Sequence, residues 1–217
     1  MNKRTIWQIG AIAALTLFMN VACSTPETVG TRVQALDGAL WNESEWISAS
    51  DAEVVTGRIS GSNWRAADGA SWFVSNVSNA KKVTSAVWMT SALGVYDIYV
   101  NGNLVGEEIL KPGFTHYAKT RYSFTYDITD AVKKGAGAEN VFAAQVTPGW
   151  WGDKIITPDG HDGMIGKKCA FRGVLELTYS DGSKEYFNTD TENWKAGVAG
   201  PVKHAAIFDG EFYDARE

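Results

Sequence analysis

The sequence is poor in cysteine, proline and positive charge. Only 2 cysteines and 5 prolines occur among 217 residues. This composition excludes a disulfide-stapled scaffold and collagen-like or disordered chains, and it indicates a globular protein. Lysine and arginine number 20 against 25 aspartate and glutamate residues, giving a formal net charge of −5. Because no excess of positive charge is present to neutralise phosphates, the composition argues against a nucleic-acid partner.

The N-terminus lacks an apolar run of the roughly 20 residues that a transmembrane helix needs. Its shorter apolar run follows Lys3 and Arg4 and precedes small residues and Cys23, which predicts a secretory signal over residues 1–22. Residues 20–23 resemble a bacterial lipobox, in which the cysteine becomes the lipidated first residue. We therefore expect a lipoprotein-type signal peptide, lipidation at Cys23, and export to the periplasm or cell surface with anchoring in the outer membrane. The alternative is a plain secretory signal with Cys23 left as a thiol.

The segment after the signal is polar and aperiodic, which is typical of a tether. We assign residues 23–44 to this tether and residues 45–217 to the folded domain. If Cys23 carries lipid, Cys169 has no disulfide partner, and we expect it to be a small buried apolar residue and not a nucleophile.

The folded part shows short segments of alternating, β-branched and aromatic character, separated by turn signals. This pattern predicts an all-β sandwich or barrel. Asn101-Gly102 and Asp181-Gly182 are typical of two-residue hairpin turns. One short connector helix is predicted over residues 127–135, which have acidic residues near the start, lysines near the end and a terminal glycine. The predicted strands cover residues 72–74, 83–90, 95–100, 122–126, 141–146, 173–179 and 184–187.

The most unusual stretch is residues 147–164, which combine paired tryptophans with aspartates, a lysine, a histidine and glycines. Loops of this length are uncommon unless they are functional or disordered. An indole gives a flat apolar platform for a sugar ring, while neighbouring polar side chains hydrogen-bond its hydroxyls. The alternative is that both indoles close the end of the sandwich. The sugar-binding candidates in this stretch are Trp150, Trp151, Asp153, Lys154, His161 and Asp162.

Three aspartates of the same stretch, Asp153, Asp159 and Asp162, offer oxygen ligands for Ca²⁺. Their spacing matches no defined calcium loop, so the alternative is that they are solvated turn residues. We expect no other cofactor.

A second sugar-binding candidate follows the turn Pro112-Gly113 and contains Phe114 and Tyr117. These aromatic residues also suit a plug at the end of a sandwich.

Nucleotide-binding, hydrolase-elbow and zinc-protease motifs are absent, and no acidic pair stands out as the acid and base of a glycosidase. We therefore do not expect this chain alone to be catalytic.

Several motifs, in order, resemble the N-terminal β-sandwich domain of bacterial α-L-rhamnosidases over residues 46–217. They are Ser91 to Gly102, Val105-Gly106, Leu110 to Thr115, Tyr126 to Thr129, Gly149 to Gly152, Asp181 to Ser183 and Asp209 to Arg216. Phe114 stands where this family usually has tryptophan.

The resemblance implies a jelly-roll-like antiparallel β-sandwich that takes part in substrate recognition, with the acid and base on a separate downstream domain. We therefore expect a non-catalytic recognition domain of an α-L-rhamnosidase-like glycoside hydrolase, with the chain ending before the catalytic domain. Its expected partners are a rhamnose-containing glycan or rhamnoside, the missing downstream catalytic domain, and a membrane reached only through the lipid anchor. The alternatives are a purely structural domain that packs on the catalytic domain, or a free-standing sugar-binding lipoprotein.

Overall fold

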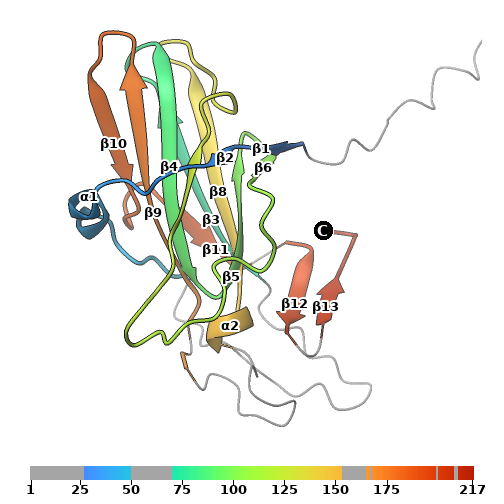
Figure 1. Ribbon diagram of the computed structural model, residues 1–217. Coiled ribbons are helices and arrows are strands. Elements are labelled where there is room, and N and C mark those ends of the chain that lie inside the picture. Colours follow the sequence, from blue (N-terminus) through green and yellow to red (C-terminus); the bar gives the residue numbers. More distant parts are fainter. Residues whose placement is uncertain (1–26, 50–69, 153–164, 167, 199, 208–209) are drawn as a thin grey trace, which may run out of the picture.

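A computed structural model describes residues 27–49, 70–152, 165–166, 168–198, 200–207 and 210–217. Two β-sheets face each other as layers, and a separate two-stranded hairpin lies beside one end of them (Figure 1). The predicted all-β sandwich is therefore confirmed. Within the described ranges, no helix is long and apolar enough to cross a membrane.

The strands of each sheet do not follow sequence order. One sheet runs β1 (Thr28–Val29), β6 (Asn103–Val105), β5 (Val95–Val100), β8 (Glu139–Thr147), β3 (Ser71–Ser78) and β11 (Lys195–Gly197). The other runs β10 (Lys184–Asn188), β9 (Ala170–Tyr179), β4 (Val83–Leu93), β7 (Phe124–Asp127) and β2 (Thr31–Arg32). The hairpin consists of β12 (Val202–Ala206) and β13 (Gly210–Tyr213), and the helices are α1 (Gly38–Glu43) and α2 (Gly149–Gly152). Among the paired strands, β1 and β6 are parallel and the rest are antiparallel.

The core between the sheets is aromatic. Trp88 on β4 meets Phe142 on β8 edge-on, with ring centroids 5.2 Å apart, and Phe73 on β3 stacks on Phe171 of β9 at 5.8 Å. Such pairs contribute about 0.5–1.5 kcal/mol each beyond the area they bury. Cys169 is buried at the edge of this core, and burial raises the pKa of its thiol to about 12. The expectation that Cys169 is buried is confirmed.

The two predicted hairpins differ in their turns. Asn101 and Gly102 both have positive φ, 51° and 87°, and join β5 to β6 as a two-residue turn, as predicted. The turn between β9 and β10 is wider, and Gly182 has a positive φ while Asp181 does not. Here the prediction was wrong in detail, because the Asp181 carboxylate accepts hydrogen bonds from the backbone and hydroxyl of Ser183 and so stabilises a different turn.

The predicted connector helix over residues 127–135 is wrong, since the segment forms turns. Three asparagines take its backbone groups and so compete with helical hydrogen bonds: Asn79 directly after β3, Asn101 in the β5–β6 turn, and Asn140 on β8. Asn79 donates to the carbonyls of residues 133 and 135, and Asn101 donates to that of residue 131. Asn140, which is buried, donates to Asn79 and accepts from the N–H of residue 133. The two short helices lie elsewhere, at α1 and α2.

The expected tether is part of the domain over its described residues, 27–44. The β1 and β2 strands pair with β6 and β7, and Val29 packs against the core. The helix α1 is held by Arg172 of β9, whose guanidinium lies 4.7 Å from the Trp41 ring and donates to Ser44. Strands of two residues are too short to show periodicity, so the sequence pattern of this segment predicted a tether.

Replacing Asn140 should destabilise the fold strongly. Asn140→Ala removes the hydrogen bonds to the N–H of residue 133 and to the side-chain oxygen of Asn79 in a buried site, and we expect a loss of about 3 kcal/mol in the free energy of unfolding. Urea denaturation measures it. Asn103→Ala, at a half-buried site on β6, is the control and should change stability by less than about 0.5 kcal/mol. Equal stability of the two variants would contradict the role of the asparagine network.

Candidate functional site

The long connection between β6 and β7, residues 106–123, is anchored to the sandwich by a lysine. The side chain of Lys111 is fully buried, and its Nζ donates to the carbonyl oxygen of Val105 at 2.9 Å. The carbonyl oxygen of Lys111 accepts from the backbone N–H of Tyr96 at 3.0 Å. Side chain and backbone of one residue therefore attach the middle of the connection to β5 and β6.

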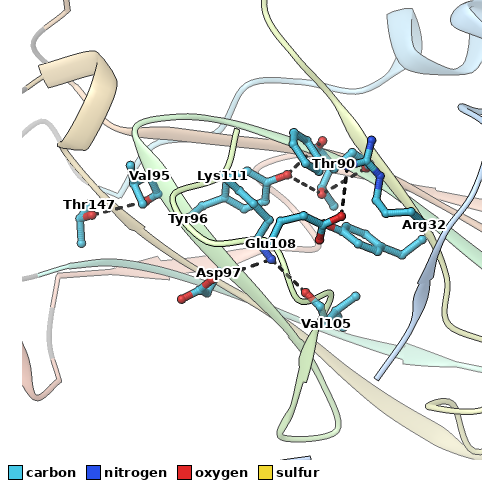
Figure 2. Close-up of polar contacts among 11 residues, drawn as sticks. Arg32, Thr90, Val95, Tyr96, Asp97, Val105, Glu108, Lys111 and Thr147 are labelled. Carbon is cyan, nitrogen blue, oxygen red and sulfur yellow. Dashed lines mark hydrogen bonds and ion pairs between the residues drawn. The ribbon is translucent and has the colours of Figure 1, made fainter. Parts of the chain in front are cut away.

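The buried ammonium of Lys111 lies among aromatic rings. It is 5.6 Å from the ring centroids of both Tyr96 and Tyr126, and 3.8 Å from Oδ1 of Asp97 (Figure 2). Burial lowers the pKa of Lys111, and the Asp97 carboxylate opposes this shift. Because an unpaired charge in the interior is costly, the ammonium restricts the connection to the one position that supplies these partners.

Glu108 provides a second anchor for the same connection. Its carboxylate accepts from the Tyr126 hydroxyl at 2.7 Å and from Arg32 of β2 at 3.1 Å (Figure 2). The Arg32 guanidinium also covers the Phe124 ring at 4.1 Å. Although burial raises the pKa of Glu108, the hydrogen bonds from Tyr126 and Arg32 hold it below its ordinary value. The carboxylate therefore stays ionised and keeps both donors.

Four aromatic side chains meet where this connection reaches the end of the sandwich, and we call them the aromatic end cluster: Phe114, Tyr117, Trp150 and Trp151. The two tryptophans belong to α2, the single helical turn that follows β8. Ring centroids are 6.3 Å apart between Phe114 and Trp150, and 5.2 Å apart between Tyr117 and Trp151. Two segments distant in sequence thus form one aromatic surface.

Hydrogen bonds fix both indoles. Trp150 donates through Nε1 to the carbonyl oxygen of Leu110 at 2.9 Å, and Trp151 donates to that of Lys168 at the same distance. Leu110 directly precedes the buried lysine. The position of Trp150 is therefore tied to the anchor at Lys111.

The inner half of the cluster is structural. Tyr117 is buried, which raises its pKa to about 12, and its hydroxyl donates to the carbonyl oxygen of Gly113. The Trp151 ring packs against Gly166, where an added Cβ would come within 1.8 Å of it. Trp151 and Tyr117 therefore close the end of the sandwich, which was the alternative interpretation of the indoles.

The outer half is accessible. Phe114 is 55% exposed, and Trp150 is half-buried beside it. A pocket of about 180 Å³ adjoins them, formed in part by Leu110 and Gly149, the residues that lead into the cluster. Its polar lining includes the carboxylates of Asp97 and Glu211, the Gln145 amide and the Thr147 hydroxyl. Aromatic faces next to convergent hydrogen-bonding groups suit a neutral hydroxylated ring such as a sugar.

The structure brings together four of the predicted sugar-binding residues, the members of the cluster. Asp153, Lys154, His161 and Asp162 lie outside the described residues, as do Asp159 and the lipidation candidate Cys23. Within the described ranges, no three His, Cys, Asp or Glu side chains gather in a way that would hold a metal ion.

The sequence pattern indicated neither the burial of Lys111 nor the polar residues that line the pocket. Tyr96 and Asp97 are neighbours on β5, so their side chains point to opposite faces of the sheet. Gln145 pairs with Asp97 across β5 and β8, and Glu211 comes from the distant hairpin, so only the folded chain brings the three together.

The comparisons with known proteins agree with one another. The model of the alpha-L-rhamnosidase N-terminal domain family matches residues 81–217. An alpha-L-rhamnosidase from Alteromonas sp. (strain LOR) is 31% identical over 196 residues, covering 90% of this chain and 20% of the relative. The chain spans only 13–20% of the length of the curated relatives it matches.

Solved structures show the same likeness. The native α-L-rhamnosidase of Aspergillus terreus superposes with a TM-score of 0.70 at 28% identity, covering 81% of this chain and 19% of that one. The Streptomyces avermitilis α-L-rhamnosidase, complexed with L-rhamnose, gives a TM-score of 0.59 at 34% identity over 68% of this chain and 14% of that one.

A Cβ at Gly166 should displace Trp151 without altering the tryptophan itself. In Gly166→Ala we expect the ring to leave Tyr117, with a red-shifted tryptophan emission and a loss of about 2–3 kcal/mol in stability through overpacking. Gly135→Ala, where the added Cβ would meet only Ala138 at 3.9 Å, is the control. If the tryptophan emission and the thermal midpoint of Gly166→Ala are unchanged, Trp151 does not pack against Gly166.

Proposed function

The chain belongs to the alpha-L-rhamnosidase N-terminal domain family, and we propose that it is the carbohydrate-recognition part of an α-L-rhamnosidase-like glycoside hydrolase. In this proposal the aromatic end cluster and the adjoining pocket bind a terminal rhamnose unit of a glycan or rhamnoside. The acid and base of the hydrolysis lie outside this chain. Export and lipid attachment at Cys23 belong to the same proposal, because recognition of an external glycan takes place outside the cytoplasm.

The exposed outer half of the cluster carries this proposal. Phe114 and Trp150 offer apolar ring faces, and Asp97 lies on the neighbouring pocket wall. Sugars bind proteins through this combination, because the C–H face of the ring is apolar while its hydroxyls need hydrogen-bond partners. The anchored connection keeps the rings in place before the ligand arrives, which lowers the entropy cost of binding.

A second candidate function, packing against another domain, is favoured by the exposed apolar side chains next to the cluster. Ile109 is 86% exposed, and Leu110 and Phe114 are about half exposed. Contiguous exposed apolar residues mark interaction sites, and a partner domain would cover them. The curated relatives are several times longer than this chain, so further domains are present in those proteins.

Titration with methyl α-L-rhamnoside tests the recognition proposal. We expect saturable binding followed by tryptophan fluorescence and calorimetry, weakened about tenfold or more in Phe114→Ala and Trp150→Ala because each removes one wall of the platform. Tyr122→Ala is the matched control: this tyrosine is exposed to a similar degree on the same connection but lies outside the cluster, and affinity should be unchanged.

Absence of binding to the unaltered chain, or equal affinity in all three variants, would refute the recognition proposal. The docking alternative makes the opposite prediction in the same samples. It expects no rhamnoside binding, together with binding of an apolar dye that Ile109→Ser abolishes.

A further inference from the structure

The sandwich is open along one side, where the two sheets end. On that side β11 pairs with β3 only at Trp72, Phe73 and Val74. From Ser75 to Ser78, β3 has no strand partner on this edge within the described residues. In the opposite layer β10 is the last strand, with β9 as its neighbour (Figure 1). The gap between these edges is lined by residues of both sheets and leads inward to the core.

This edge cleft, as we call it, has a volume of about 310 Å³. Trp88, Phe142 and Leu175 line its inner end but are at most 3% exposed, and the partly buried Phe187 supplies accessible apolar surface. Trp194 lines the cleft near its rim and is held against Phe171, with ring centroids 5.5 Å apart. The accessible apolar surface of the cleft therefore comes from partly buried aromatic side chains at its rim.

Two polar groups that line the cleft are unsatisfied. Ser75 is 95% buried, and its hydroxyl makes no hydrogen bond to the described part of the chain. Oδ1 of Asn188 is buried, and it too has no partner there. Buried polar atoms are nearly always hydrogen-bonded in folded proteins, so the Asn188 oxygen, in the same cleft as the Ser75 hydroxyl, indicates a bound group that supplies a partner.

The charges around the cleft favour a neutral ligand. No lysine, arginine or histidine is among the described residues that line it. Its one carboxylate, Asp190, accepts hydrogen bonds from the backbone N–H groups of Glu192 and Asn193 and from the Asn193 amide. These bonds, which outweigh the effect of burial, hold the pKa of Asp190 below its ordinary value. An anionic ligand would find no counter-charge in this site.

We propose that the edge cleft is a second sugar-binding site, which takes one 6-deoxyhexose unit. The methyl group and one apolar ring face pack on Phe187 and Trp194, and the hydroxyls bond to Ser75 and Asn188. A hydroxymethyl group in place of the methyl would bring an unpaired hydroxyl onto these aromatic rings. The choice of sugar class rests in part on the proposed function, but the site shares no residue with the aromatic end cluster.

Nuclear magnetic resonance of the full chain separates the two sites, because Trp194 reports on the cleft and Trp150 on the cluster. We expect L-rhamnose to shift the indole N–H signal of Trp194 saturably. L-Mannose, which differs by a hydroxyl on C6, should bind the cleft about tenfold more weakly, because its extra hydroxyl is buried unpaired.

Variants of the cleft complete the test. Ser75→Ala removes a hydroxyl with no protein partner, so the chain should stay fully stable while the affinity measured at Trp194 falls about fivefold or more. Asn188→Ala should have a similar effect on affinity. Ser71→Ala, on the same strand but outside the cleft, is the matched control and should change neither property.

The outcomes distinguish the two sites. A shift at Trp150 with none at Trp194 would overturn the cleft proposal and leave the recognition proposal standing. A shift at Trp194 that persists in Phe114→Ala supports the cleft even if the cluster binds nothing. Equal affinity of Ser75→Ala, Asn188→Ala and the unaltered chain at Trp194 would also overturn the cleft proposal.

Discussion

The candidate site depends on one buried charge. The Lys111 ammonium lies between Tyr96 and Tyr126, donates to Val105 and is paired with Asp97. A connection of eighteen residues without strands of its own would otherwise sample many positions, at a conformational cost on binding. Because leaving this charge unpaired costs several kcal/mol, the connection has a single favourable position. That position places Leu110 under the Trp150 indole and Phe114 beside it.

In the aromatic end cluster, two residues stabilise the fold and their neighbours are accessible to a ligand. Trp151 and Tyr117 close the end of the sandwich, whereas Trp150 and Phe114 face outward next to a pocket with carboxylate and amide groups. In the proposed function the outer rings take the apolar face of the sugar and the pocket takes its hydroxyls. A rigid aromatic surface would also suit a docked domain. The two candidate functions, sugar binding and domain packing, therefore use the same surface and differ in the partner that covers it.

The sequence predicted the elements with strong periodicity and missed those set by distant contacts. The strands and the Asn101-Gly102 turn follow from local pattern, and so do the aromatic residues of the cluster. The predicted connector helix does not form because Asn79, Asn101 and Asn140, from distant parts of the sequence, take the backbone groups of that segment. The role of Lys111 and the convergence of Asp97 with Glu211 are tertiary, and no local pattern marks a lysine as buried. The short strands near residues 28–32 are stabilised by their partners alone.

The most direct test of the account is a crystal structure of the chain with methyl α-L-rhamnoside. The account predicts a sugar ring against Phe114 and Trp150 with hydroxyls toward Asp97, and no movement of the backbone near Lys111 between the free and bound states. An unoccupied cluster at saturating ligand, or a connection that rearranges around Lys111 to bind, would contradict it.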